Sequence, residues 1–243
     1  MTKKIALVFC LLPLFFTSNA QLKGAFKKFK NKLTERNLSQ EEVGMGLKEA
    51  LNKGVEEAVN NLSAVDGYYK SPYKILVPEE AQKVTDKLKF VPGFSNVEKK
   101  LVEKMNRAAE LAAAKAKPIF VRAIKQMTFT DAMNILMGQP DAATRYLERT
   151  TSDSLFAEFK PVIQTSLDEV HAREYWRSAV TAYNKIPLVS KTNPELDEHV
   201  TKMALVGLFS LVEKKELAIR ENTGERTSDL LRKVFAKQDK NRD

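Results

Sequence analysis

Apolar residues recur at every third or fourth position through most of the chain, which is the period of an amphipathic α-helix. The pattern is clearest after residue 40, where it places Val43, Leu47, Leu51, Val55, Val59 and Leu62 on one face. Ser39 and Glu42 precede this stripe with the spacing of a capping box. We therefore predict a helix that begins near Ser39 and buries the stripe.

The segment from Met105 to Arg149 concentrates small residues, a proline and several carboxylates. Its run of alanines favours a helix whose narrow surface lets a neighbouring helix approach closely. Pro118 lacks a backbone N–H and clashes with the preceding turn, so the helix that starts near Ser95 should kink or restart there. We therefore expect a kinked central helix.

Short helices should follow this central helix. Thr130 is the predicted N-cap of one that ends at Gly138, with Asp131 in its first turn, where the helix dipole favours a carboxylate. Pro140 and Asp141 should open the next. The remaining predicted helices span 79–88, 141–146, 153–159, 162–185, 194–220 and 228–236, with breaks at Pro92-Gly93 and Pro161 and an N-cap at Asn193.

Patterns of alternating apolar and polar residues, which are typical of strands, are almost absent. The exception is Ile75–Val77, within a segment that glycine and proline make irregular. The predicted fold class is therefore all-α: a single multi-helix domain with short helices and at most one short strand. We expect it to occupy 37–237, followed by a polar tail at 238–243.

The first twenty residues have the pattern of a secretory signal peptide. Lys3 and Lys4 precede an apolar run over 5–16, and Ser18-Asn19-Ala20 places small residues at a cleavage site. Cleavage there would remove Cys10, the only cysteine, and with it any disulfide or thiolate chemistry. The longest later apolar run, 204–212, is too short to cross a bilayer. We expect a periplasmic protein of a Gram-negative envelope, soluble or peripheral.

Residues 21–36 form a basic amphipathic segment, in which Leu22, Phe26, Phe29 and Leu33 share one helical face among lysines. Such a helix can lie on an anionic membrane surface. The alternative is a solvated helix that docks on the body, or a frayed terminus. The candidate contact residues for a membrane or partner are Phe26, Lys27, Lys28, Phe29 and Lys30.

The formal charge of +9 stays positive after Lys3 and Lys4 are removed. In an exported protein, this charge favours anionic partners such as lipid, polysaccharide or acidic protein, and not nucleic acid. No spacing typical of zinc ligands, nucleophilic serines or phosphate-binding loops is present, so we expect no cofactor and no metal.

One set of polar residues is a candidate pocket: Asn106, Arg107, Glu110, Asp131, Asp141, Tyr146 and Arg220. Carboxylates that converge in a cleft can bind a divalent cation or act as acid and base. Helix capping explains Asp131 and Asp141 equally well, and helical ion pairs explain Arg107–Glu110 and Glu216–Arg220. We favour a structural network, which leaves catalysis as the lesser alternative.

Several segments resemble a bacterial exported family catalogued as domain of unknown function 4197. They are GLKEALNKGVEEAV at 46–59, MNRAAE at 105–110, DAMNILMG at 131–138, DAATRYLERTTSDSL at 141–155, HVTKMALVGLF at 199–209 and the IREN…RTSDLLRKVF ending. The resemblance implies a signal peptide and a mostly helical body, with no activity, cofactor or catalytic set. His199 stands where the family more often has an aromatic residue, and Thr223-Gly224 departs from a proline-containing form.

These observations favour an exported helical binding or scaffolding protein that interacts with an envelope protein or an anionic or amphipathic envelope component. One alternative is a lipid or small-molecule carrier with an apolar cavity between its helices. That cavity would be lined by Phe120, Met127, Met133, Met137 and Phe209. The other is an enzyme or metal-binding protein that uses Glu110, Asp131 and Asp141.

Overall fold

A computed structural model describes residues 39–78, 82, 97–185, 187–188, 191, 193 and 195–239. The chain divides into two units, Met1–Asn37 and Leu38–Asp243, and all of the described residues belong to the second. The signal peptide, the amphipathic segment with Phe26–Lys30, the helix expected at 79–88 and the turn at Pro92-Gly93 lie outside the described residues.

The described residues form eight α-helices and one 3-10 helix, with no strand among them. They are α2 (Gln40–Ser63), α4 (Val97–Ala113), α5 (Ala116–Gln126), α6 (Phe129–Leu136), α7 (Ala142–Asp168), α8 (Ala172–Tyr183), α9 (Leu196–Glu221), η1 (Thr223–Glu225) and α10 (Asp229–Asp239). The predicted all-α class is confirmed, and the strand allowed for Ile75–Val77 does not form.

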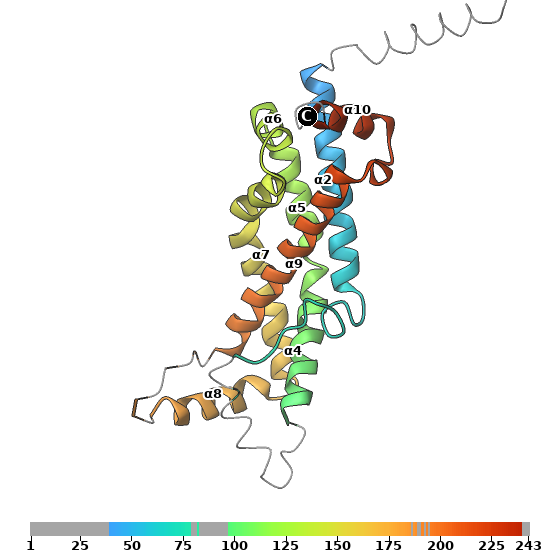
Figure 1. Ribbon diagram of the computed structural model, residues 1–243. Coiled ribbons are helices and arrows are strands. Elements are labelled where there is room, and N and C mark those ends of the chain that lie inside the picture. Colours follow the sequence, from blue (N-terminus) through green and yellow to red (C-terminus); the bar gives the residue numbers. More distant parts are fainter. Residues whose placement is uncertain are drawn as a thin grey trace, which may run out of the picture. The chain divides into compact units, whose positions relative to one another are not determined.

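The long helices pack side by side around one apolar core. α9 lies against α7 and α2, while α4 and α5 follow one another along α7 (Figure 1). Phe120 of α5 and Phe209 of α9 meet edge to face, with ring centroids 5.9 Å apart at 82°. On α2, small residues at Gly46, Ala50 and Gly54 are all buried, which lets α9 and α10 approach its backbone closely.

Two sequence predictions about helix starts are confirmed. Ser39 Oγ accepts a hydrogen bond from Glu42 N at 3.1 Å, and Glu42 accepts one from Ser39 N at 2.8 Å, so the capping box of α2 is complete. The central helix restarts as expected: α4 ends at Ala113, and α5 begins two residues before Pro118. Pro118 therefore falls in a first turn, where its missing N–H has no helical partner to lose.

The N-cap of α6 is Thr128, so the prediction of Thr130 is wrong by two residues. Thr128 Oγ1 accepts from Asp131 N at 3.1 Å, and Asp131 Oδ2 accepts from Thr128 N at 3.0 Å. Asp131 sits in the first turn as predicted, and here it completes a capping box. α6 ends at Leu136, two residues before Gly138.

The helices expected at 141–146 and 153–159 and the first part of the one expected at 162–185 are one helix, α7, which runs through Pro161. The prediction of one helix over 162–185 is wrong, because α7 ends at Asp168 and α8 begins at Ala172. Leu155, Phe159, Ile163 and Leu167 form a buried stripe, whereas Pro161 and Ala157 lie on the exposed side. Water can therefore satisfy the Ala157 carbonyl that loses its helical partner. Packing of the stripe outweighs the cost of the proline.

The observed ends of the last two α-helices also differ from the predicted ends. α9 begins at Leu196 with Glu195 as its N-cap, and the side chain of Asn193 accepts from Glu195 N at 2.9 Å, so the N-cap predicted at Asn193 is wrong by two residues. α10 begins after Ser228, as expected, and extends to Asp239, into the expected tail.

Candidate functional site

The irregular connection after α2, residues 64–78, lies across α4 and α9 (Figure 1). Asp66 has a positive φ of 70°, a conformation that aspartate tolerates better than most residues. Tyr68 is fully buried beneath the connection. We call residues 64–78 the anchored loop, because four side chains from α4 and α9 bind it: Asn106, Arg107, Glu110 and His199.

Glu110 of α4 fixes the first part of the anchored loop. One carboxylate oxygen accepts hydrogen bonds from the backbone N–H groups of Tyr68 and Tyr69, each at 3.1 Å. The other accepts from Arg107 at 2.8 Å, and Arg107 also donates to Asp66 at 2.7 Å. Glu110 is only 4% exposed. Its buried charge is therefore stabilised by one cation and two backbone donors.

Asn106 makes the hydrogen bonds to the second part of the loop that a neighbouring β-strand would make in a sheet. Its side-chain oxygen accepts from Ile75 N, and its amide nitrogen donates to Ile75 O, both at 2.8 Å. This pair of bonds is what a partner strand would supply to an extended residue. Ile75–Val77 had the sequence pattern of a strand, yet its hydrogen bonds go to a helix side chain.

α9 holds the other side of the anchored loop. The Tyr68 hydroxyl donates to the carbonyl of Ala204 at 2.7 Å, and His199 Nε2 donates to the carbonyl of Leu76 at 2.9 Å. Burial, and then the charge of Glu110, raise the pKa of Tyr68, so its hydroxyl remains a donor. A Cβ at Gly207 would lie 3.0 Å from the Tyr68 ring, so glycine permits this close approach.

Part of the anchored loop faces solvent. Val65 is 80% exposed and Leu76 is 53% exposed. Between these two residues in the sequence, Tyr69 has a half-buried ring, with Lys74 Nζ at 5.0 Å and the Arg107 guanidinium at 5.1 Å from its centroid. These are cation–π distances. Val65, Tyr69, Lys74 and Leu76 form what we call the loop surface.

The other predicted pocket residues lie in different places. Asp131 is engaged in the α6 capping box, where its bonds to Thr128 lower its pKa. Tyr146 is near it, since burial and then the Asp131 charge raise the Tyr146 pKa. Asp141 pairs with Arg145 at 2.9 Å. Glu110 lies on α4 with its own partners, so the structure does not give these three carboxylates a shared ligand site.

Arg220 lies in a second buried network, at the junction of α6, α7 and α9. Its guanidinium donates to the carbonyls of Ile135 and Leu136 at the end of α6, and to Glu216 at 2.8 Å. Glu216 in turn accepts from the backbone N–H groups of Ala143 and Thr144 at the start of α7. Arg220 thus places a positive charge at the C-terminal end of α6, and Glu216 places a negative charge at the N-terminal end of α7. Each helix dipole favours the charge at its end.

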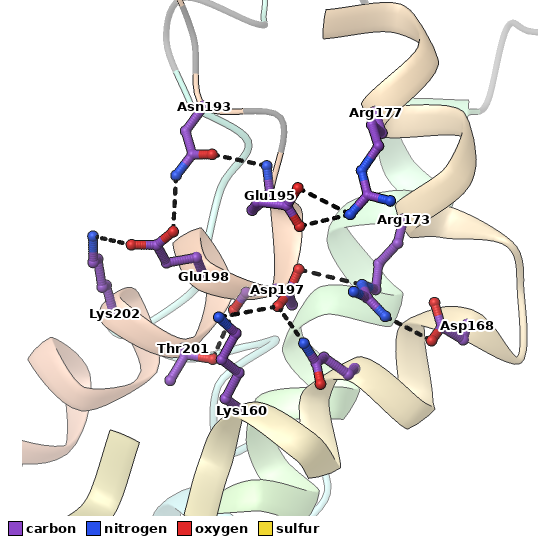
Figure 2. Close-up of polar contacts among 11 residues, drawn as sticks. Lys160, Asp168, Arg173, Arg177, Asn193, Glu195, Asp197, Glu198, Thr201 and Lys202 are labelled. Atoms are coloured by element: carbon purple, nitrogen blue, oxygen red, sulfur yellow. Dashed lines mark hydrogen bonds and ion pairs between the residues drawn. The ribbon is translucent and has the colours of Figure 1, made fainter. Parts of the chain in front are cut away.

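A third network, which sequence analysis did not identify, surrounds Asp197 in the first turn of α9 (Figure 2). Asp197 is 1% exposed; it accepts from Gln164 at 2.8 Å and from Arg173 at 3.2 Å, with Lys160 at 3.9 Å. These partners come from α7 and α8. A carboxylate in a first turn was the available signal, but nothing in the sequence indicated that it would be buried.

The alternatives of a carrier and a metal protein gain no support from the described residues. A cavity between α2, α7, α9 and α10 measures about 20 Å³, enough for about one water molecule. None of the five expected lining residues borders it; Phe120, Met127 and Phe209 are buried, Met133 is partly buried and Met137 is exposed. A larger, open hollow of about 390 Å³ lies between the start of α2 and the turn from α5 to α6, and of the five residues it is lined by Met127 alone. Within the described ranges, no group of three or more His, Cys, Asp or Glu side chains is placed to hold a metal ion.

A family model described as "Protein of unknown function (DUF4197)" matches residues 37–236. The chain belongs to the DUF4197 family. No curated protein and no solved structure matches it. In this DUF4197 protein, the MNRAAE segment supplies Asn106, Arg107 and Glu110, while the IREN segment supplies Arg220. These polar residues bond largely to the backbone of the anchored loop and of helix ends.

None of the described helices is long and apolar enough to cross a membrane. The polar residues that the sequence singled out have partners within the fold.

Proposed function

We propose that this DUF4197 protein is an exported, periplasmic binding or scaffolding protein, without catalysis, that recognises an envelope protein or an anionic or amphipathic envelope component through its loop surface. The observation that carries this proposal is the anchoring of residues 64–78. The buried side chains of Glu110 and Asn106 on α4 bond to backbone groups of Tyr68, Tyr69 and Ile75, and His199 on α9 bonds to the carbonyl of Leu76.

Holding a loop with buried polar side chains carries a desolvation cost, which is expected where the shape of the loop is used. Glu110 and Asn106 give up hydration to bind the loop, and an apolar contact would stabilise the helices equally well. A loop fixed before binding loses less conformational entropy when a partner arrives. Rigid presentation of Val65 and Leu76, with cations beside Tyr69, is therefore consistent with recognition.

The proposal of export rests on the sequence of residues 1–20 and on the positive charge of the chain. Fractionation of cells that produce the full chain, with and without residues 1–20, tests it. The mature protein should appear in the periplasmic fraction with Gln21 as its first residue. Cytoplasmic retention of the full chain would contradict export.

Site-specific photo-cross-linking in the producing cells tests the loop surface. A benzophenone side chain replaces Val65 or Leu76, and the control position is Glu158, which is exposed on α7. We expect a discrete adduct from both loop positions and none from the control. Equal adducts from all three positions, or none from the loop, would contradict the proposal.

A further inference from the structure

α4 has one solvent-facing side that runs beside the anchored loop. Lys100, Lys104, Arg107 and Leu111 recur at spacings of three, four and seven residues, which places them on one helical face. Lys115 lies two residues beyond the end of α4, where it is the N-cap of α5. Leu111 is 60% exposed in the middle of this row. We call Lys100, Lys104, Leu111 and Lys115 the basic row.

The charges of the basic row are available to a partner. In the described part of the chain, no carboxylate lies within ion-pair distance of Lys100, Lys104 or Lys115. Several cations on other faces are paired: Arg145 contacts Asp141, Glu148 and Glu213, Arg177 contacts Glu195, and Lys202 contacts Glu198. Unpaired lysines on one helix face attract a negatively charged partner. They speed its association and stabilise the bound complex.

The basic row is continuous with the loop surface. Arg107 lies on the same helix face and contacts both Asp66 and Tyr69 of the anchored loop. Val65, next to Asp66, adds an exposed apolar side chain to that of Leu111. A partner that covers this face therefore meets lysines, two exposed aliphatic side chains and an aromatic ring.

We infer that the basic row binds an acidic protein segment, an amphipathic helix whose carboxylates meet the lysines and whose apolar side chains pack on Leu111 and Val65. This inference rests on the proposed binding function and names the partner's chemistry. From Lys100 to Leu111, a helix rises about 17 Å, so three turns of a partner helix span this part of the row.

Charge at the edges of the row favours a narrow partner over a lipid surface. Glu103 is half-exposed on α4 beside Lys100 and Lys104, and Asp66 lies beside Arg107. A flat anionic membrane would press these carboxylates against its headgroups and repel them. A single helix that follows the row contacts the lysines, Leu111 and Val65 and covers less of the surface that carries these carboxylates.

The test places the benzophenone side chain at Leu111 of the full chain, in parallel with the loop position Leu76 and the control Glu158. The double variant K100E/K104E reverses two charges of the row. K214E/K233E makes the same change at two exposed lysines on α9 and α10, which also lack a carboxylate partner in the described ranges. Mass spectrometry of the adduct then identifies the cross-linked molecule.

We expect Leu111 to cross-link to a peptide rich in aspartate and glutamate, with a yield about tenfold lower in K100E/K104E and unchanged in K214E/K233E. Replacing that peptide's carboxylates by lysine should restore cross-linking to K100E/K104E. A lipid adduct, or a peptide adduct that K100E/K104E leaves intact, overturns the inference. Adducts from Leu76 but none from Leu111 overturn it while the proposed function stands. No adduct from either position overturns both.

Discussion

At the scale of single residues, the buried carboxylate of Glu110 is the main fixed point of the anchored loop. It accepts two backbone hydrogen bonds from the loop and one from Arg107, and it lies almost wholly out of solvent. Removing such an acceptor leaves buried donors without partners, which costs more than the bonds themselves contribute.

Glu110→Ala should therefore lower the free energy of unfolding by about 3 kcal/mol, measured by urea denaturation. Glu110→Gln keeps an oxygen for Tyr68 N and Tyr69 N and should lose less. Glu103→Ala, a half-exposed glutamate on the same helix, is the control and should change the value by no more than about 0.5 kcal/mol. Equal losses for Glu110→Ala and Glu103→Ala would show that the loop bonds contribute little.

Asp66 gives the anchored loop a pH dependence of definite sign. Its hydrogen bonds to Lys70, and then to Arg107, lower its pKa below the ordinary aspartate value. The stability that it contributes is therefore fully present above the unfolded-state pKa of about 3.9 and is lost as pH falls through the lowered folded-state pKa.

The free energies of unfolding of the wild type and of Asp66→Asn should differ by a constant amount from pH 6 to 8. This difference should shrink as the pH falls below about 4. Asparagine tolerates the positive φ at this position, so the backbone is preserved. A difference that grows as pH falls would contradict the assigned sign.

At the scale of elements, ion pairs on α9 determine how neighbouring helices end. Arg220 bonds to the last carbonyls of α6, and Glu216 bonds to the first N–H groups of α7. Because both side chains are buried, removal of one leaves the other charge uncompensated.

Arg220→Met should lower the free energy of unfolding by about 3–5 kcal/mol. The double variant Glu216→Gln/Arg220→Met removes both charges and should lose less than the sum of the two single variants. Arg232→Met on the exposed side of α10 is the control. Strict additivity of the two single losses would contradict coupling between the α6 and α7 ends.

Asp197 joins α8 to α7 and α9, and the only tryptophan of the chain reports on that junction. Trp176 of α8 is buried and donates to the carbonyl of Asn193 at 3.3 Å. Asp197→Asn weakens the bond to Arg173, so Trp176 fluorescence should shift to longer wavelength and become more accessible to acrylamide. Asp153→Asn, an exposed aspartate on α7, should leave both unchanged. An unshifted spectrum in Asp197→Asn would contradict this role.

The sequence was informative where one local interaction decides the structure. The stripe of α2 and its capping box depend on residues within a few positions of one another, and so does the restart before Pro118. Pro161 was misinterpreted because the gain from packing its helix against distant α9 outweighs a local cost. The partners of Asn106 and Glu110 were missed for the same reason: they bond to a loop about thirty to forty residues earlier in the chain.

At the scale of the whole molecule, the residues that resembled a catalytic set are dispersed: Glu110 and Arg220 belong to different networks, and Asp131 and Asp141 bond locally at helix starts. Three buried polar networks connect the helices. One holds the anchored loop, one closes the junction of α6 and α7, and one joins α8 to its neighbours. In each, carboxylates and cations satisfy backbone groups or each other. The central claim is therefore that the MNRAAE segment holds residues 64–78 in a fixed shape that is used for binding.

Amide hydrogen exchange of the mature protein, read residue by residue, tests that claim most directly. The amides of Tyr68, Tyr69 and Ile75 should exchange far more slowly than those of an unstructured peptide, because buried side chains accept their hydrogens. In Asn106→Leu, protection should be lost around Ile75 and kept in α7 and α9. Wild-type loop amides that exchange at unprotected rates would contradict the account.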